Sequence, residues 1–271
     1  MRSWLALLLV CAPLAAGEIN DIEFARPGGV PLTLDAYVPD GRGPFPAVIV
    51  VHGGGWEAGS KRSYEKPLLP ALTEAGFAWF TINYRLAPHH KFPAAVEDVE
   101  AAIRWVKRNA RTYKVDPRRV ALMGESAGGH LAAMAAVRGR GETRVAAVVD
   151  FYGPHDLVKR ETDRGEVGRN LRQFLGVERL DEEGIAKLRE ASPVTYVRRG
   201  LPPFLLIHGT KDAAVPYEQS PLFCEKLRAA GNRCEVFPVE GAPHGVGAWE
   251  KNPEWLAYQR KMTEWLRAAL R

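Results

Sequence analysis

Apolar runs alternate with helical patterns along the chain from residue 46 onward. The runs are rich in β-branched residues and lack polar alternation, which is typical of strands buried on both faces of a parallel sheet. Strands are predicted at residues 47–52, 77–83, 120–124, 145–151, 204–208 and 234–239. The pattern therefore predicts an α/β fold with a mostly parallel central sheet and helices on both faces.

Two helices are the clearest elements between and after these strands. Residues 93–109 begin with a proline, which favours the first helical turn, and repeat apolar residues at helical spacing. Near the C-terminus, Asn252 and Pro253 are typical of a helix start. The apolar stripe that follows them is Trp255, Tyr258, Met262, Trp265 and Leu266. Such a stripe predicts a helix packed on the core.

Two further segments complete the predicted domain. Residues 19–24 and 32–38 flank Pro27-Gly28-Gly29 and predict an antiparallel hairpin that leads into the sheet. Residues 153–202 interrupt the strand–helix rhythm with two short helical patterns and predict a lid-like insertion. Residues 18–271 contain no linker, repeat or low-complexity tract, so we expect a single α/β domain.

The first residues have the pattern of a secretory signal peptide. Arg2 gives a positive start, residues 4–14 form a short apolar run, and Ala15-Ala16-Gly17 offers small residues for cleavage near Gly17. A buried first helix or strand is the alternative, but the run has no polar face. A lipid attached at Cys11 is a second alternative, which the branched Val10 disfavours. We expect a secreted or periplasmic protein without stable membrane insertion after processing.

Composition and charge exclude several classes of protein. The chain has 271 residues, of which 46% are hydrophobic, and this excludes a wholly disordered chain. Without Arg2, 36 Lys and Arg face 32 Asp and Glu, a formal charge of about +4. The charges alternate in sign without a long basic run, so no nucleic-acid partner is expected.

A possible nucleophile lies between the predicted strand 120–124 and an Ala-rich helical pattern. The sequence there is Gly124-Glu125-Ser126-Ala127-Gly128. Glycines on both sides allow the strained strand–turn–helix geometry that exposes a serine hydroxyl. A structural glycine turn is the alternative, but the strand and helix contexts favour catalysis by Ser126.

A glycine-rich loop, His52-Gly53-Gly54-Gly55-Trp56, follows the first buried strand. Glycines let backbone N–H groups approach a developing oxyanion. A phosphate-binding loop is the alternative, but neither the Walker nor the dinucleotide pattern is present. We expect His52 to brace the loop rather than to act as an acid or a base.

The remaining catalytic groups are predicted from their places after strands. A serine needs a base, and the base needs a carboxylate that fixes its tautomer. Asp212 and His244 each follow a late strand, in the chain order that this architecture uses. Asp150 and Asp156 are spare candidates for the acid. The other histidines lack this position, and we expect His208 to lie in the core or beside the site.

Cysteines and metal-ligand spacing add little further chemistry. Cys224 and Cys234 flank a Gly-Asn turn and are expected to form a disulfide after export, with two buried thiols as the alternative. No His, Cys or Asp cluster has zinc spacing, so neither a metal nor another cofactor is predicted.

Taken together, these motifs resemble α/β-hydrolases of the esterase/lipase group, which includes hormone-sensitive-lipase-like esterases and the bacterial feruloyl and acetylxylan esterases. The segments that carry the resemblance are 52–56, 83–88 (Asn-Tyr-Arg-Leu-Ala-Pro), 92–94 (Phe-Pro-Ala), Asp98, 124–128, Asp212 and His244-Gly245. The resemblance implies an oxyanion hole from the N–H groups of Gly53 or Gly54 and of Ala127. It also implies a structural Arg85–Asp98 pair. We expect no counterpart of the large N-terminal helical cap of hormone-sensitive-lipase-like esterases.

The expected activity is a two-step acyl transfer on a small-molecule or polysaccharide ester, with acetyl or feruloyl esters favoured. Trp56, Tyr152 and Trp249 adjoin the catalytic segments and are candidate pocket residues, with core packing as the alternative. An arylformamidase-like or small-peptide amidase on the same triad is a rival function. A non-catalytic binding protein on the same fold is a rival of another class, which the intact triad disfavours.

Overall fold

The computed structural model describes residues 17–63 and 67–271. The predicted signal peptide lies outside them except for Gly17, which opens the first strand. The strands are β1 (Gly17–Ala25), β2 (Leu32–Val38), β3 (Phe45–Val51), β4 (Ala78–Ile82), β5 (Val115–Glu125), β6 (Ala147–Phe151), β7 (Phe204–Gly209) and β8 (Cys234–Val239). The α-helices are α1 (Leu69–Glu74), α2 (Ala94–Arg108), α3 (Ala127–Arg138), α4 (Leu157–Arg164), α5 (Arg169–Leu175), α6 (Glu182–Glu190), α7 (Gln219–Ala229), α8 (Val246–Trp249) and α9 (Ala257–Ala269).

The described strands form a single sheet in the order β1-β2-β4-β3-β5-β6-β7-β8. β2 is antiparallel to both β1 and β4, whereas β4, β3 and β5 to β8 run parallel. The predicted hairpin and the predicted mostly parallel sheet are both confirmed. The fold is that of an α/β-hydrolase.

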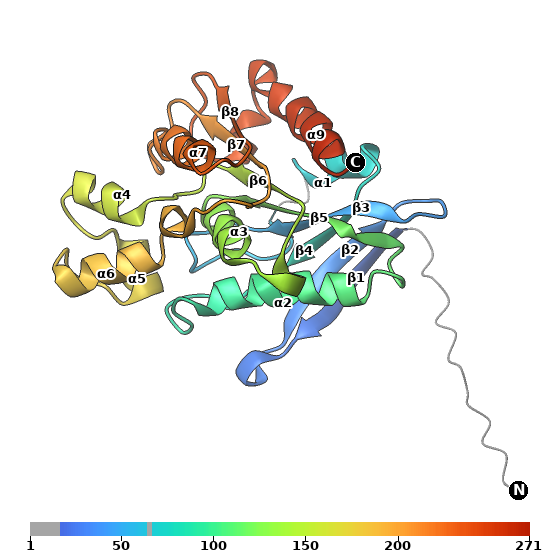
Figure 1. Ribbon diagram of the computed structural model, residues 1–271, viewed down its shortest axis with the longest axis horizontal. Helices are drawn as coiled ribbons and strands as arrows, with labels where there is room; N and C mark the ends of the chain where they lie inside the picture. Colours follow the sequence, from blue (N-terminus) through green and yellow to red (C-terminus); the bar gives the residue numbers. More distant parts are fainter. Residues whose placement is uncertain (1–16, 64–66) are drawn as a thin grey trace, which may run out of the picture.

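Two apolar layers cover the sheet because its buried strands are apolar on both faces. Ala47, Ile49 and Val51 of β3 face the layer that contains α2, α3 and α7, while Val48 and Val50 face the layer of α1 and α9. In Figure 1, α2 lies on the lower side of the sheet and α9 on its upper side. The central strands are therefore fixed from both sides, and their carboxyl ends are held in place.

The structure corrects two predicted boundaries. β5 begins at Val115, because Phe45 pairs with Val115 before the register shift, and the polar residues 116–119 hid this part of the strand. The C-terminal segment opens with a single 3-10 turn at Pro253–Trp255, capped by Asn252, and the α-helix starts only at Ala257. Its stripe does pack inward, since Tyr258, Met262 and Leu266 are buried.

The insertion between β6 and β7 holds three α-helices, α4, α5 and α6, rather than the expected two. α5 spans seven residues and has only Leu171, Phe174 and Leu175 on its buried side, too few to show a helical period in the sequence. These helices project together at one end of the sheet (Figure 1). The insertion thus lies where the catalytic strands end.

Candidate active site

Ser126 occupies a strained turn between β5 and α3. Its φ of 51° and ψ of −118° place it in a region that L-residues rarely adopt, and its N–H donates to Phe151 O at 2.8 Å. The flanking glycines make this turn possible. A Cβ on Gly124 would lie 2.3 Å from Gly128 O, and one on Gly128 would lie 2.1 Å from Val51 O. The turn therefore holds the serine hydroxyl at the start of α3.

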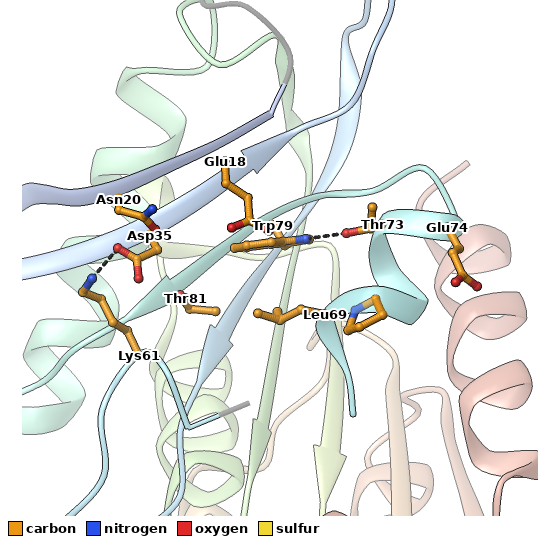
Figure 2. Close-up of a pocket in the computed structure, with 10 residues that line it drawn as sticks. Glu18, Asn20, Asp35, Lys61, Leu69, Thr73, Glu74, Trp79 and Thr81 are labelled. Atoms are coloured by element: carbon orange, nitrogen blue, oxygen red, sulfur yellow. Dashed lines mark hydrogen bonds and ion pairs between the residues drawn. The ribbon is translucent and has the colours of Figure 1, made fainter. Parts of the chain in front are cut away.

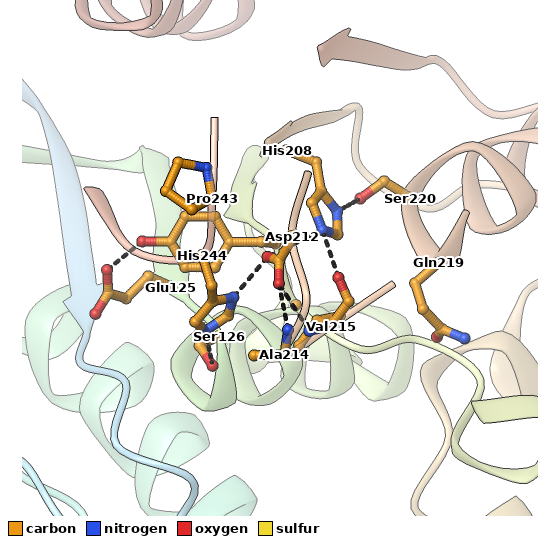
Figure 3. Close-up of polar contacts among 12 residues, drawn as sticks. Glu125, Ser126, His208, Asp212, Ala214, Val215, Gln219, Ser220, Pro243 and His244 are labelled. Atoms are coloured by element: carbon orange, nitrogen blue, oxygen red, sulfur yellow. Dashed lines mark hydrogen bonds and ion pairs between the residues drawn. The ribbon is translucent and has the colours of Figure 1, made fainter. Parts of the chain in front are cut away.

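The structure brings the three predicted catalytic residues together. His244 Nε2 lies 3.1 Å from Ser126 Oγ, and His244 Nδ1 lies 2.6 Å from Asp212 Oδ2 (Figure 3). Asp212 follows β7 and His244 follows β8, so strands distant in sequence supply the two groups. A serine in contact with a histidine that a carboxylate orients is the geometry of an activated nucleophile.

The Asp212 carboxylate is held in one orientation. Its Oδ1 accepts hydrogen bonds from the N–H groups of Ala214 and Val215, each at 2.8 Å. His208 Nε2 lies 3.3 Å from Oδ2 and also donates to Val215 O at 3.0 Å. Burial raises the pKa of Asp212, but the hydrogen bonds from His208, His244 and Val215 outweigh burial and keep the pKa well below its usual range. Asp212 is therefore ionised whenever His244 needs a counter-charge.

The spare acids have other partners. Asp150 accepts from Gly153 N at 2.7 Å and pairs with the buried His155 at 3.1 Å. Asp156 caps α4 by accepting from Lys159 N at 2.9 Å. The geometry thus favours Asp212 as the acid.

The glycine loop is stabilised by contacts of His52, and Gly54 of the loop lies at the cleft. His52 Nδ1 donates to Gly53 O at 2.7 Å, and the His52 ring stacks on Tyr84 with centroids 4.2 Å apart. Gly54 has a φ of +109°, and a Cβ there would lie 2.1 Å from Ala58 O, so only glycine fits. Gly54 and Ala127 both line the cleft beside Ser126. Two of the three predicted oxyanion-hole residues thus line the cleft with the nucleophile, whereas Gly53 is not among the described lining residues.

The resemblance also implied a pair of structural residues behind this loop. Arg85 donates to both oxygens of the Asp98 carboxylate through Nε, and the Arg85 backbone N–H donates to Asp98 Oδ2 at 2.8 Å. The pair ties the segment after β4 to α2. Neither residue is among the described residues that line the cleft with Ser126, in agreement with the expected structural role.

The cleft over Ser126 has a volume of about 560 Å³. The described residues that line it are Gly54, Gly55, Trp56, Glu125, Ser126, Ala127, Pro154, Arg160, Arg164, Gly168, Arg169, Asn170, Leu171, Ala213, Ala214, Val215, His244 and Gly245. Trp56 is a lining residue, as expected, and is fixed by stacking on Phe174 of α5 at 4.8 Å. The three arginines were not predicted as site residues. Their only sequence signal was the arginine-rich composition of the insertion.

The expectation that Tyr152 and Trp249 line the pocket is wrong, because both side chains are fully buried. Tyr152 OH donates to Glu125 and accepts from Val246 N at 2.8 Å, and its ring lies 4.6 Å from the His244 ring. Trp249 Nε1 donates to Pro243 O at 2.7 Å. Both aromatic residues hold the loop that carries His244 and do not face the cleft.

Glu125 lies under the same loop and lines the cleft floor. Burial raises the pKa of its carboxyl, and the hydrogen bond from Tyr152 and the nearby His244 oppose this rise only in part. Glu125 is the residue before the nucleophile, and no role was predicted for its side chain.

Two buried histidines keep their neutral form. Trp56 Nε1 donates to His130 Nδ1 at 3.1 Å, so His130 Nε2 carries the hydrogen and donates to Ala191 O at 2.7 Å. Burial lowers the pKa of both His52 and His130 to about 4. Neither can serve as a cationic group near neutral pH.

Acid destabilisation is expected from these two histidines. Between about pH 6.5 and pH 4, these two histidines bind protons in the unfolded chain but stay neutral in the folded protein. The free energy of unfolding therefore falls by roughly 3 kcal/mol for each histidine as the pH drops through this range. Urea unfolding at pH 7 and pH 4.5 measures the fall. The fall in unfolding free energy is expected to be smaller in His130→Gln. It is expected to be as large as in the wild type in His89→Gln, which alters an exposed residue. An equal fall in all three proteins contradicts the assignment.

A second cavity, of about 410 Å³, lies at the opposite edge of the sheet, between β1, β2, β4 and α1. Lys61 there is buried and pairs with Asp35, while Trp79 Nε1 donates to Thr73 (Figure 2). None of its described lining residues is Ser, Cys or His. The cleft at Ser126 is therefore the candidate active site.

Comparison with known proteins agrees with this geometry. The BD-FAE family profile matches residues 34–227, which is more than half of the chain. The chain belongs to the BD-FAE family. This membership places it among α/β-hydrolase esterases and confirms the resemblance drawn from the sequence motifs.

The curated relatives that this chain matches include esterases. Esterase LipC of Mycobacterium tuberculosis is 36% identical over 215 residues, which are 74% of this chain and 53% of LipC. An acetylxylan esterase of Xylanibacter ruminicola is 30% identical over 234 residues, which are 85% of this chain and 46% of that enzyme. This BD-FAE chain thus spans about half the length of the curated relatives it matches.

Solved structures match over almost their full length. A truncated carbohydrate esterase from gut microbiota superposes with a TM-score of 0.81 at 27% identity, covering 94% of this chain and 96% of that one. The esterase Est2 of Thermogutta terrifontis, solved with propionate bound, gives a TM-score of 0.75 at 30% identity, covering 93% and 94%. The BD-FAE chain therefore shares one fold with esterases of similar size. No helix in its described ranges is long and apolar enough to cross a bilayer.

Proposed function

We propose that this chain is a secreted serine esterase that hydrolyses carboxylic esters through an acyl-enzyme at Ser126. The observation that carries the proposal is the continuous contact from Ser126 Oγ through His244 to the ionised Asp212. Acetyl or feruloyl esters of plant polysaccharide, or similar short-chain or aromatic esters, are the proposed substrates. The names of the acetylxylan esterase and of the gut carbohydrate esterase support this choice.

The first half of the reaction makes the acyl-enzyme. Ser126 Oγ attacks the ester carbonyl carbon while its proton passes to His244 Nε2. The carbonyl oxygen becomes an oxyanion, which the N–H groups of Ala127 and of Gly53 or Gly54 stabilise. The bond to the alcohol then breaks, and the alcohol leaves with the proton from His244. Asp212 stabilises the imidazolium throughout this step.

The second half releases the acid. A water gives a proton to His244 Nε2 and its oxygen attacks the acyl carbon, which restores the oxyanion in the same hole. The bond to Ser126 Oγ breaks, and Ser126 takes back the proton from His244. The mechanism uses no group beyond the chain and water.

Export is part of the same proposal. The N-terminal pattern of a positive start, an apolar run and small residues supports secretion or a periplasmic location. The disulfide between Cys224 of α7 and Cys234 of β8, with Cα atoms 5.4 Å apart, suits an oxidising compartment. Residues 18–271 are proposed to form one mature domain.

Hydrolysis assays test the proposal. The mature protein is expected to cleave acetyl and butyryl nitrophenyl esters, and either methyl ferulate or acetylated xylan. Ser126→Ala lowers kcat by about 10⁴-fold or more because it removes the nucleophile, and circular dichroism checks that it stays folded. If the protein hydrolyses N-formylkynurenine but none of the esters, and Ser126→Ala loses this activity, the function is that of an amidase. Equal turnover by both proteins would exclude the serine mechanism.

A further inference from the structure

The wall of the cleft that the insertion supplies is basic. Arg160 and Arg164 of α4 and Arg169 of α5 all line the cleft, and the only acidic residue among its described lining residues is Glu125. The Glu125 carboxylate is already engaged by Tyr152 OH. Three arginines therefore border the space in which a bound ester would lie.

The acidic partners of these arginines do not line the cleft. Arg169 pairs with Glu57 at 2.9 Å and Arg164 with Glu166 at 3.6 Å. Arg160 pairs with the buried Glu161 at 3.3 Å, and Glu161 also accepts from Gly168 N. Each carboxylate thus approaches its arginine from outside the cleft.

Arg160 has donors left for a ligand. Its side chain is 16% exposed, and its contacts within the described ranges are the hydrogen bond to Ala214 O at 3.2 Å and the ion pair with Glu161. A guanidinium carries five N–H donors, so several have no protein partner. Its position next to Ala214, which donates to Asp212, puts these donors near the catalytic residues.

Arg160 and Arg164 also lie close enough to repel each other. Burial lowers the pKa of Arg160 and the nearby Arg164 adds to this shift, whereas Glu161 and Asp212 oppose it. Arg164 reaches the cleft at Gly168, where an added Cβ would lie 3.2 Å from Arg164 Nη1. An anion between the two guanidinium groups would relieve both the repulsion and the desolvation.

We infer that the cleft selects esters that carry a carboxylate in their acyl or alcohol part, and that Arg160, Arg164 and Arg169 bind this carboxylate. The inference rests on the proposed esterase function and narrows its substrate class. Guanidinium–carboxylate hydrogen bonds are charge-assisted and directional, so they orient the ester as well as hold it. Asp163 and Glu218 line a neighbouring cavity beyond Arg160 and Arg164, which restricts the anion to the Ser126 side.

Matched pairs of neutral and anionic esters test this selectivity. One pair carries the charge on the alcohol, 4-acetoxybenzoate against its amide. The other pair carries the charge on the acyl group, the mono-4-nitrophenyl ester of adipic acid against 4-nitrophenyl hexanoate. The kcat/KM ratio of anionic to neutral ester is compared between wild type and variants, so the intrinsic reactivity of each ester cancels.

Arg164→Gln and Arg169→Gln are the first variants, because their side chains are 52% and 71% exposed and their loss leaves no buried charge unpaired. We expect the double variant to lower the anionic-to-neutral ratio of at least one pair by about tenfold, mainly through a higher KM. Arg160→Lys keeps a charge beside Glu161 and is expected to lower the ratio as well. Arg179→Gln removes an exposed arginine of the same insertion outside the cleft and keeps the wild-type ratio.

The outcomes separate this inference from the proposed function. Neutral ester turnover with unchanged ratios in every arginine variant overturns the inference and leaves the esterase function intact. Absence of Ser126-dependent turnover overturns the esterase function. Binding to folded Ser126→Ala then decides the inference alone. In calorimetry this variant should bind 4-hydroxybenzoate more tightly than 4-hydroxybenzamide, or the mono-4-nitrophenyl ester of adipic acid more tightly than 4-nitrophenyl hexanoate. Equal binding within both pairs overturns the inference.

Discussion

Asp212→Asn is expected to lower kcat for ester hydrolysis by about 10⁴-fold while the protein remains folded. The asparagine side chain can turn its NH2 group toward His244 Nδ1, which then accepts a hydrogen bond instead of donating one. The proton of the neutral imidazole moves to Nε2 and faces Ser126 Oγ, so His244 can no longer take the serine proton. The imidazolium of the transition state also loses its counter-charge.

Stopped assays with 4-nitrophenyl acetate measure this loss. Asp163→Asn makes the same chemical change on the exposed side of α4, where Asp163 pairs with Lys159, and should keep kcat within about twofold. A loss below tenfold in folded Asp212→Asn would show that another acid orients His244.

The sequence was most informative where strands are buried on both faces. The runs that became β3, β6, β7 and β8 were predicted within two residues at each end, because every residue in such a strand must be apolar. The first half of β5 was not predicted because it carries the exposed Pro117 and Arg118 and the polar Asp116, which interrupt the apolar run. Local pattern therefore reveals a strand only as far as both of its faces are covered.

The catalytic residues could be predicted for a similar physical reason. Parallel strands all end at one edge of the sheet, so residues that follow β5, β7 and β8 must come close together in space. The directions of neighbouring side chains could not be predicted in this way. Tyr152 and Trp249 adjoin catalytic segments in sequence, yet their rings turn into the layer beneath the His244 loop.

The basic wall of the cleft could not be located from sequence. Arg160, Arg164 and Arg169 lie in an insertion without a strand, and only the packing of α4 and α5 brings them to Ser126. Phe174 of α5 contributes to this placement by stacking on Trp56 of the glycine loop. Contacts between segments far apart in sequence decide which charged residues line the cleft. A local sequence pattern does not reveal such contacts.

Gly128→Ala is expected to destabilise the fold by about 3 kcal/mol and to lower kcat by about 10²-fold. The added Cβ would lie 2.1 Å from Val51 O and 2.4 Å from His52 O, so the end of β3 must move away from α3. That movement displaces the glycine loop, whose N–H groups are the proposed oxyanion donors. Both effects therefore have one cause, the close approach of two backbone segments.

Thermal unfolding and ester hydrolysis measure the two effects together. In a chain of this length, about 3 kcal/mol corresponds to a Tm lower by roughly 6–12 °C. Gly247→Ala is the matched control, because Gly247 is exposed in α8 and its added Cβ would meet nothing within 4 Å. It should leave kcat unchanged and raise stability by about 0.5 kcal/mol, since alanine restricts the unfolded chain. Equal Tm values for the two variants would mean that β3 and α3 approach each other less closely than the structure shows.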